Sequence, residues 1–85
     1  MKEVEKILYK MGYYDSDPNK VAEVQGYVEE AEEFMLACGV PREQLGSRRA
    51  YAIKSIWADA RDQGNDDTLV RQDGMIVALV AQLRR

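Results

Sequence analysis

The segment that decides the fold is residues 17–41, DPNKVAEVQGYVEEAEEFMLACGVP. Asp17 can accept a hydrogen bond from a free backbone N–H, and Pro18 suits the first helical position, so a long helix is predicted to begin here. Gly39 and Pro41 are predicted to end it. Apolar side chains at helical spacing predict its buried face, which consists of Val21, Val24, Tyr27, Val28, Ala31, Phe34, Met35 and Cys38.

The opposite side of this helix is predicted to carry glutamates, namely Glu29, Glu30, Glu32 and Glu33. Gly26 is unfavourable by about 1 kcal/mol relative to alanine in a helix interior. Two interpretations stay open: Gly26 marks the close crossing of another helix, or it is tolerated without benefit.

Three further helices are predicted around this one. The first uses Val4, Ile7, Leu8 and Met11 and stops near Gly12. The third covers residues 42–63, with Ser47 as a possible second start and the Gly-Asn pair at 64–65 as the stop. A polar connection over residues 65–74 is predicted to lead to a last helix that Asp73 caps. No stretch alternates long enough to require a strand, so the prediction is a single all-α domain, residues 1–85, of about four helices.

Charge is unevenly distributed along the chain, whose net charge is −3. Residues 1–40 hold four lysines against nine acids, a net of −5, and residues 41–85 hold eight cations against six acids, a net of +2. An acidic protein is a poor general binder of phosphate backbones, so at most weak, non-specific contact with DNA is expected. Surfaces of two signs suit contact with another copy or another protein, although solvated helix faces are an equally simple explanation of any single charge.

The residue types needed for most catalysis and metal binding are missing. The chain has no histidine and one cysteine, Cys38, and it lacks the glycine-rich phosphate-binding motifs. We therefore expect no enzyme activity, no catalytic residues, no metal site and no cofactor. Cys38 is expected to be an inert apolar residue rather than a nucleophile. Trp57 either packs in the core, the favoured interpretation, or serves as an exposed anchor for a partner.

The chain is expected to be cytosolic and not embedded in a membrane. It begins without the basic and then apolar pattern of a secretory signal, and its longest apolar run, residues 75–81, is far shorter than the roughly 20 residues that span a bilayer. That run leads directly to the closing QLRR of residues 82–85.

Taken in order, the segments of the chain resemble the small head–tail connector, or adaptor, proteins of tailed bacteriophages and prophages, a family that is also labelled as DNA-packaging proteins and has a C-terminal Q-L-R-G string. The segments that carry the resemblance are VEKILYKMGYY, DSDPNK, VAEVQGYVEEAEEFMLACGV, PREQLGSRRAYAIKSIWADARDQGN and IVALVAQLRR. Within them, the matching residues are Ala31, Glu32, Phe34, Met35, Arg61, Gly64, Asn65, Gln82, Leu83 and Arg84. Arg85 stands where the family has glycine, so the closing match rests on three residues.

The resemblance implies a structural virion protein that forms a ring between portal and tail and continues the DNA channel, without a catalytic step. Its partners would be further copies of itself, the portal protein and tail-side proteins. It would be found in the host cytoplasm during assembly and then at the head–tail junction of the virion.

A ring requires two different faces of each subunit to meet, which the acidic first part and the basic second part of the chain could supply. The hypothetical interface residues are Glu29, Glu30, Glu33, Arg48, Arg49, Arg61, Gln82, Leu83, Arg84 and Arg85. Arg84 and Arg85 would meet acids such as Glu30 or Glu33 of a neighbour. Removal of residues 82–85 should then weaken assembly and leave a mostly helical monomer.

Two other functions remain open. A small helical interaction module or regulator would bind another protein through an exposed helix face. Alternatively, SRRAYAIKSIWADAR, residues 47–61, could be the recognition helix of a helix-turn-helix DNA-binding protein, although Asp59, Asp62 and the acidic preceding helix would repel phosphates.

Overall fold

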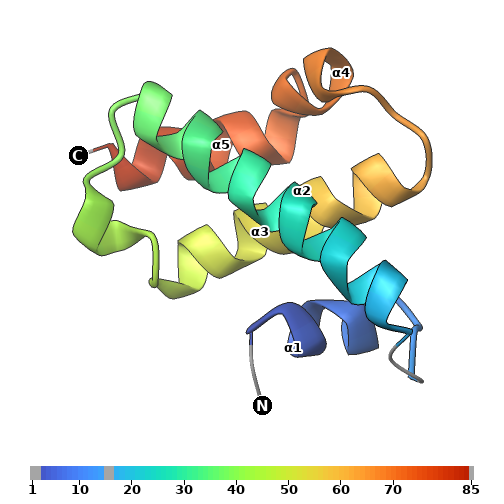
Figure 1. The fold of residues 1–85 in the computed structure, drawn as a ribbon. Helices are drawn as coiled ribbons and strands as arrows, with labels where there is room; N and C mark the ends of the chain where they lie inside the picture. Colours follow the sequence, from blue (N-terminus) through green and yellow to red (C-terminus); the bar gives the residue numbers. More distant parts are fainter. Residues whose placement is uncertain (1–2, 15–16, 85) are drawn as a thin grey trace.

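Two helices that cross at the centre of the molecule organise the fold, α2 (Pro18–Ala37) and α3 (Arg48–Asp62) (Figure 1). The computed structural model describes residues 3–14 and 17–84. These form five α-helices and one 3-10 turn, with no strand. The other elements are α1 (Glu3–Lys10), the turn η1 (Arg42–Gln44), α4 (Asp67–Arg71) and α5 (Gly74–Leu83). The predicted all-α architecture is confirmed.

The predicted start and stop signals act as expected. The side chains of Asp17, Ser47 and Asp73 accept hydrogen bonds from the backbone N–H groups that open α2, α3 and α5. Gly12, Gly39 and Gly64 follow helix ends at positive φ, a conformation that glycine adopts without strain. Ser47 separates η1 from α3, so the region predicted as the third helix consists of a turn and a helix.

The connection predicted over residues 65–74 is not entirely irregular, because residues 67–71 form α4. Asp66 caps this short helix by accepting a hydrogen bond from the Leu69 N–H at 2.9 Å. Val70 is buried against α3 and α5, so burial of this side chain stabilises a helix that would be too short to persist in isolation.

The core has two apolar clusters, one on each side of the central crossing. The smaller joins α1 to the first half of α2 and the middle of α3, and contains Val4, Ile7, Leu8, Val24, Val28 and Ala58. The larger lies between the second half of α2, α3, α4 and α5, and contains Ala31, Met35, Val40, Ala50, Ile53, Trp57, Val70, Ile76, Val80 and Leu83. Trp57 is fully buried with its ring 5.1 Å from that of Phe34, which confirms its predicted packing role.

Candidate assembly surfaces

Two of the hypothetical interface residues, Glu30 and Arg61, bind each other within one subunit. The Arg61 Nε donates to Glu30 Oε1 at 2.8 Å, and the Trp57 indole N–H donates to the same oxygen at 2.9 Å. The bond to Glu30 raises the pKa of Arg61 above its usual value. Glu30 therefore joins α2 to α3 and satisfies the polar atom of a buried tryptophan.

The other two glutamates among the hypothetical interface residues, Glu29 and Glu33, lie on the exposed side of α2. They are one helical turn apart, so both project from the same side of the helix. Neither forms an ion pair with a described residue. We call this pair the acidic stripe.

The structure brings several predicted basic residues together where the start of α3 lies near the end of α5. Arg48 and Arg49, at the start of α3, line a hollow of about 390 Å³ with Gln44, Ser47 and Leu83. Figure 1 shows the last turn of α5 close to the segment that joins α2 to α3. Arg84 directly follows Leu83 and is exposed, as is Gln82, whereas Arg85 lies outside the described residues. We call Arg48, Arg49 and Arg84 the basic cluster.

The cations of the basic cluster form no ion pair with the described residues of their own subunit. The acidic stripe and the basic cluster thus lie on different elements and keep their charges available. Such an arrangement can join one subunit to the next through two different surfaces, which is a heterologous contact.

Leu83 belongs to the larger apolar cluster and is only 4 % exposed. Its side chain packs in its own subunit rather than on the surface. Deletion of residues 82–85 would therefore remove a core side chain together with the cations, so substitution of Arg84 is the cleaner perturbation.

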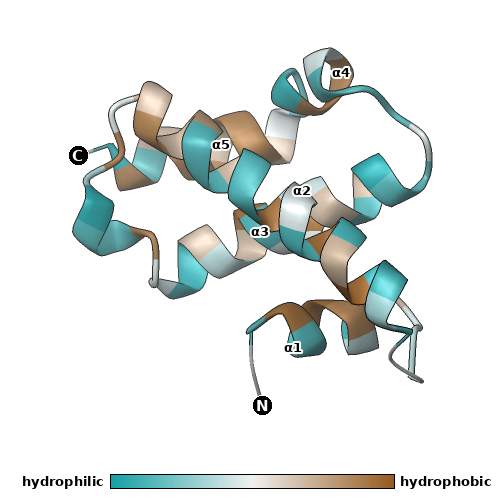
Figure 2. Ribbon diagram, viewed as in Figure 1, coloured by the Kyte–Doolittle hydropathy of each residue, from teal (hydrophilic) through white to brown (hydrophobic). Residues whose placement is uncertain are grey.

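The exposed side of α5 is apolar, like the side that packs in the core. No charged residue occurs between Asp73 and Arg84, and Figure 2 shows the ribbon of α5 mainly brown or pale, in contrast to the teal segments of α2. Met75 is 60 % exposed and Val77 is 52 % exposed. A helix that is apolar all round is normally covered on all sides. The absence of charge through this run is already visible in the sequence.

The burial of Lys54 was not predicted from the sequence. This lysine is 2 % exposed, yet its ammonium group donates to the Leu45 carbonyl at 2.7 Å and to Glu3 Oε1 at 3.1 Å, and it lies 3.2 Å from Glu32 Oε2. Three elements and the turn after η1 therefore meet at one cation. Its aliphatic stem fits the helical apolar spacing of α3, but its charge gave no reason to place it inside.

A polar cluster of Tyr13, Lys20 and Asp62 joins the start of α2 to the end of α3. Lys20 forms an ion pair with Asp62, and the Tyr13 hydroxyl donates to Asp62 Oδ2 at 2.7 Å. Burial alone would raise the pKa of Asp62, but the hydrogen bonds from Lys20 and Tyr13 together lower it. The same contacts raise the pKa of Lys20 and that of Tyr13. Asp62 is thereby held as a carboxylate.

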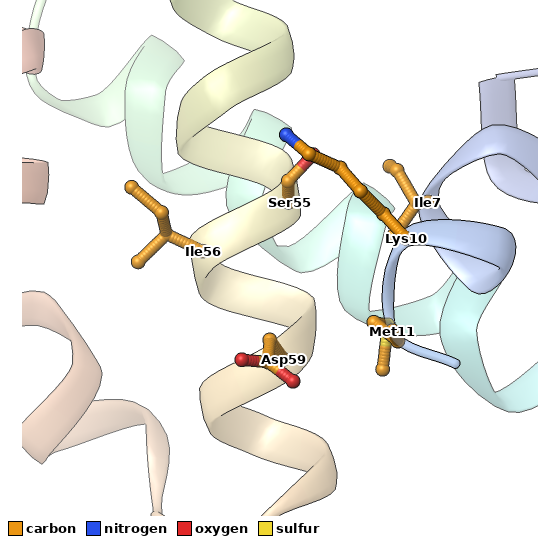
Figure 3. A pocket seen from close by; sticks show the side chains of 6 residues that line it. All are labelled: Ile7, Lys10, Met11, Ser55, Ile56 and Asp59. Atoms are coloured by element: carbon orange, nitrogen blue, oxygen red, sulfur yellow. The ribbon is translucent and has the colours of Figure 1, made fainter. Parts of the chain in front are cut away.

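An apolar hollow between α1 and α3 is lined by Ile7, Lys10, Met11, Ser55, Ile56 and Asp59 (Figure 3). The Ser55 hydroxyl is buried and has no hydrogen-bond partner among the described residues. No base orients this hydroxyl there, so the hollow lacks the arrangement that activates a serine nucleophile.

Within residues 3–14 and 17–84, no three Cys, Asp or Glu side chains come together in a way that could hold a metal ion. None of the helices described is both long and apolar enough to cross a membrane.

Comparison with protein-family models found no match. Comparisons with curated proteins and with solved structures likewise found no significant similarity.

Proposed function

We propose that this chain is a structural subunit that assembles head to tail into a ring, and that the ring is a head–tail connector of a tailed phage or prophage. The connector role is supported by the order of segments along the sequence. The assembly is supported by one observation above all: the acidic stripe and the basic cluster lie on different elements of one subunit and are unpaired within the described chain.

Head-to-tail contact follows from the separation of these charges. When the acidic stripe of one copy meets the basic cluster of the next, the first copy keeps its basic cluster and the second keeps its acidic stripe free for a further neighbour. Contacts of this kind close into a ring where the rotation between neighbours allows it. Copies of the chain are therefore the first partners, and portal and tail-side proteins would contact the faces of the ring.

The assembly is tested by sedimentation of the full chain over a concentration series. Arg84→Glu should weaken association and leave a folded, helical subunit, because Arg84 is exposed and outside the core. Lys10→Glu is the matched control, since Lys10 is also exposed but lies at the end of α1 and lines the hollow with Ser55 and Asp59 rather than the one with Arg48. Equal sedimentation of wild type and Arg84→Glu at every concentration would contradict the proposed contact.

The second candidate is a small interaction module, favoured by the exposure of Met75 and Val77 on α5. Concentration-dependent mass separates the two functions: a module remains monomeric or dimeric, whereas a connector forms larger closed assemblies.

The helix-turn-helix alternative conflicts with the position of α3. This helix is at the centre of the fold, and its sides pack against α2 and α5, with α1 and α4 adding further contacts. The Asp59 carboxylate is among its few exposed side chains. A recognition helix must enter a DNA groove, which a helix enclosed in this way cannot do.

A further inference from the structure

The outer face of α5 is an unpartnered apolar surface at the end of the described chain. It consists of Gly74, Met75, Val77, Ala78, Ala81 and Gln82, all exposed. Around the helix, the small residues Gly74, Ala78 and Ala81 fall at the middle of this face, with Met75 and Val77 on its two sides. The face is therefore a shallow groove between two larger side chains, shaped to receive a narrow helix.

The outer face of α2 is narrow where Ala22 and Gly26 lie. Its exposed residues also include Glu29 and Glu33 toward the C-terminal end, with Gln25 and Ala37 at its sides. Gly26 has a helical backbone, and a Cβ atom built on it would meet nothing within 4 Å. The glycine thus weakens the helix without any close crossing inside its own subunit. One of the two interpretations of Gly26, a crossing within the fold, is thereby removed.

We propose that the outer face of α5 in one copy docks on the outer face of α2 in the next. This rests on the proposed head-to-tail assembly and assigns its contact. Gly26 then has a purpose, because a glycine opposite Ala78 lets two helix axes approach closely, as small residues do at helix crossings. A second copy is the proposed occupant because its α2 face combines the small residues Ala22 and Gly26 with acids that match Arg84 at the C-terminal end of α5.

Charge sets the orientation of the two helices. The acidic stripe lies toward the C-terminal half of α2, and the basic cluster lies at the C-terminal end of α5. Parallel helices put Arg84 near Glu33 and Glu29, whereas antiparallel helices would put the capping Asp73 there and leave the cations unpaired. The lengths agree: Gly74 to Arg84 and Ala22 to Glu33 each span about 15–17 Å at 1.5 Å per residue.

The contact is tested by disulfide trapping in full-length chains that carry Cys38→Ser, which removes the natural thiol. Gly26→Cys and Ala78→Cys are prepared in separate chains, mixed in equal amounts and oxidised gently. We expect a disulfide-linked dimer in the mixture and not in either variant alone. Lys6→Cys mixed with Gly26→Cys is the control and should form little of the linked species.

The outcomes separate the docking from the assembly itself. A chain that assembles by sedimentation but gives no link in the mixture overturns the docking and leaves head-to-tail assembly standing. A linked dimer from Ala78→Cys alone overturns it in favour of a twofold pair of α5 helices. A chain that is monomeric throughout and forms no link overturns both proposals.

Gly26→Ala and Gly26→Leu provide a second test. If Gly26 had a purely structural role, these substitutions would not weaken self-association while raising stability. Both replace a poor helix former at a site with open space, so the melting temperature should rise. Self-association should nevertheless weaken, slightly for alanine and by about tenfold or more for leucine, because the added side chain separates the helices. A Gly26→Leu chain that is more stable and assembles like the wild type would overturn the proposed docking.

Discussion

At the scale of single residues, Lys54 is the polar group on which the packing of α1, α2 and α3 most depends. Its ammonium group lies between Glu3 and Glu32 and bonds to the Leu45 carbonyl, while its stem is enclosed. A buried cation requires such partners, because removal from water without them is very unfavourable. The two carboxylates are each about one-third exposed, so water still reaches them.

We expect Lys54→Met to lower the free energy of unfolding by about 1–3 kcal/mol, since methionine keeps the apolar stem but leaves the Leu45 carbonyl and two carboxylates without their donor. Urea denaturation measures the change. Lys6→Met, an exposed substitution on α1, should alter stability by less than about 0.5 kcal/mol. Equal stability of Lys54→Met and wild type would show that the cation contributes nothing to the packing.

Asp62 makes the stability of the protein sensitive to acid. Because its pKa is lower in the folded chain than the ordinary 3.8, the stability that it contributes is complete above the unfolded pKa and is lost as the pH falls through the folded value. Asp62→Asn should therefore be less stable than the wild type at pH 7, and the difference should shrink as the pH is lowered below about 4.

The measurement is a series of urea midpoints from neutral to acidic pH. Asp59→Asn is the matched control, because Asp59 lies on the same helix but is exposed and accepts only from the Gln63 side chain. A constant difference between wild type and Asp62→Asn across the series would rule out the ion pair with Lys20 as its source.

At the scale of the elements, α5 depends on its cap. Asp73 Oδ1 accepts hydrogen bonds from the N–H groups of Met75 at 2.9 Å and Ile76 at 3.2 Å. Asp73→Ala should destabilise the fold by about 0.5–2 kcal/mol, as for other caps, and should increase hydrogen exchange of the α5 amides before those of α3. Uniform exchange changes across all the helices would contradict a local role.

Local signals explain why most elements could be predicted from the sequence. Asp17 with Pro18, Ser47 and Asp73 act on the few residues that follow them, and glycines at positive φ close helices by their own backbone freedom. α4 could not be predicted from periodicity, because five residues are too few to display it. Its cap, Asp66, was present, but the burial of Val70 depends on α3 and α5.

The candidate site was also predictable only in part, because contacts between distant elements decide which charged residues are paired. The sequence indicates acids on one side of α2 and cations near α3 and the chain end, but pairing depends on how helices cross. Glu30 lies beside Arg61 and Trp57 across the α2–α3 crossing, so these charges are used inside the subunit. Glu29 and Glu33 lie on the exposed side of α2 and form no ion pair with the described residues.

At the scale of the whole molecule, the fold is a flattened body of 37 × 26 × 16 Å, with the acidic stripe on α2 and the basic cluster at the start of α3 and the end of α5. Its apolar side chains are covered in two clusters around α2 and α3, apart from a few exposed groups that include the outer face of α5. These surfaces lead to the central claim, which is that subunits join through the acidic stripe of one copy and the basic cluster of the next.

Charge exchange between two variants tests this claim most directly. The first variant carries Glu29→Lys and Glu33→Lys, so that its α2 surface becomes positive like its basic cluster. The second variant carries Arg48→Glu and Arg49→Glu, so that its basic cluster becomes predominantly negative like its acidic stripe. Sedimentation should find each variant dissociated on its own, because like charges then meet. An equimolar mixture should recover the large species of the wild type, since every contact again joins opposite charges. Variants that assemble alone, or a mixture that stays dissociated, would contradict the account.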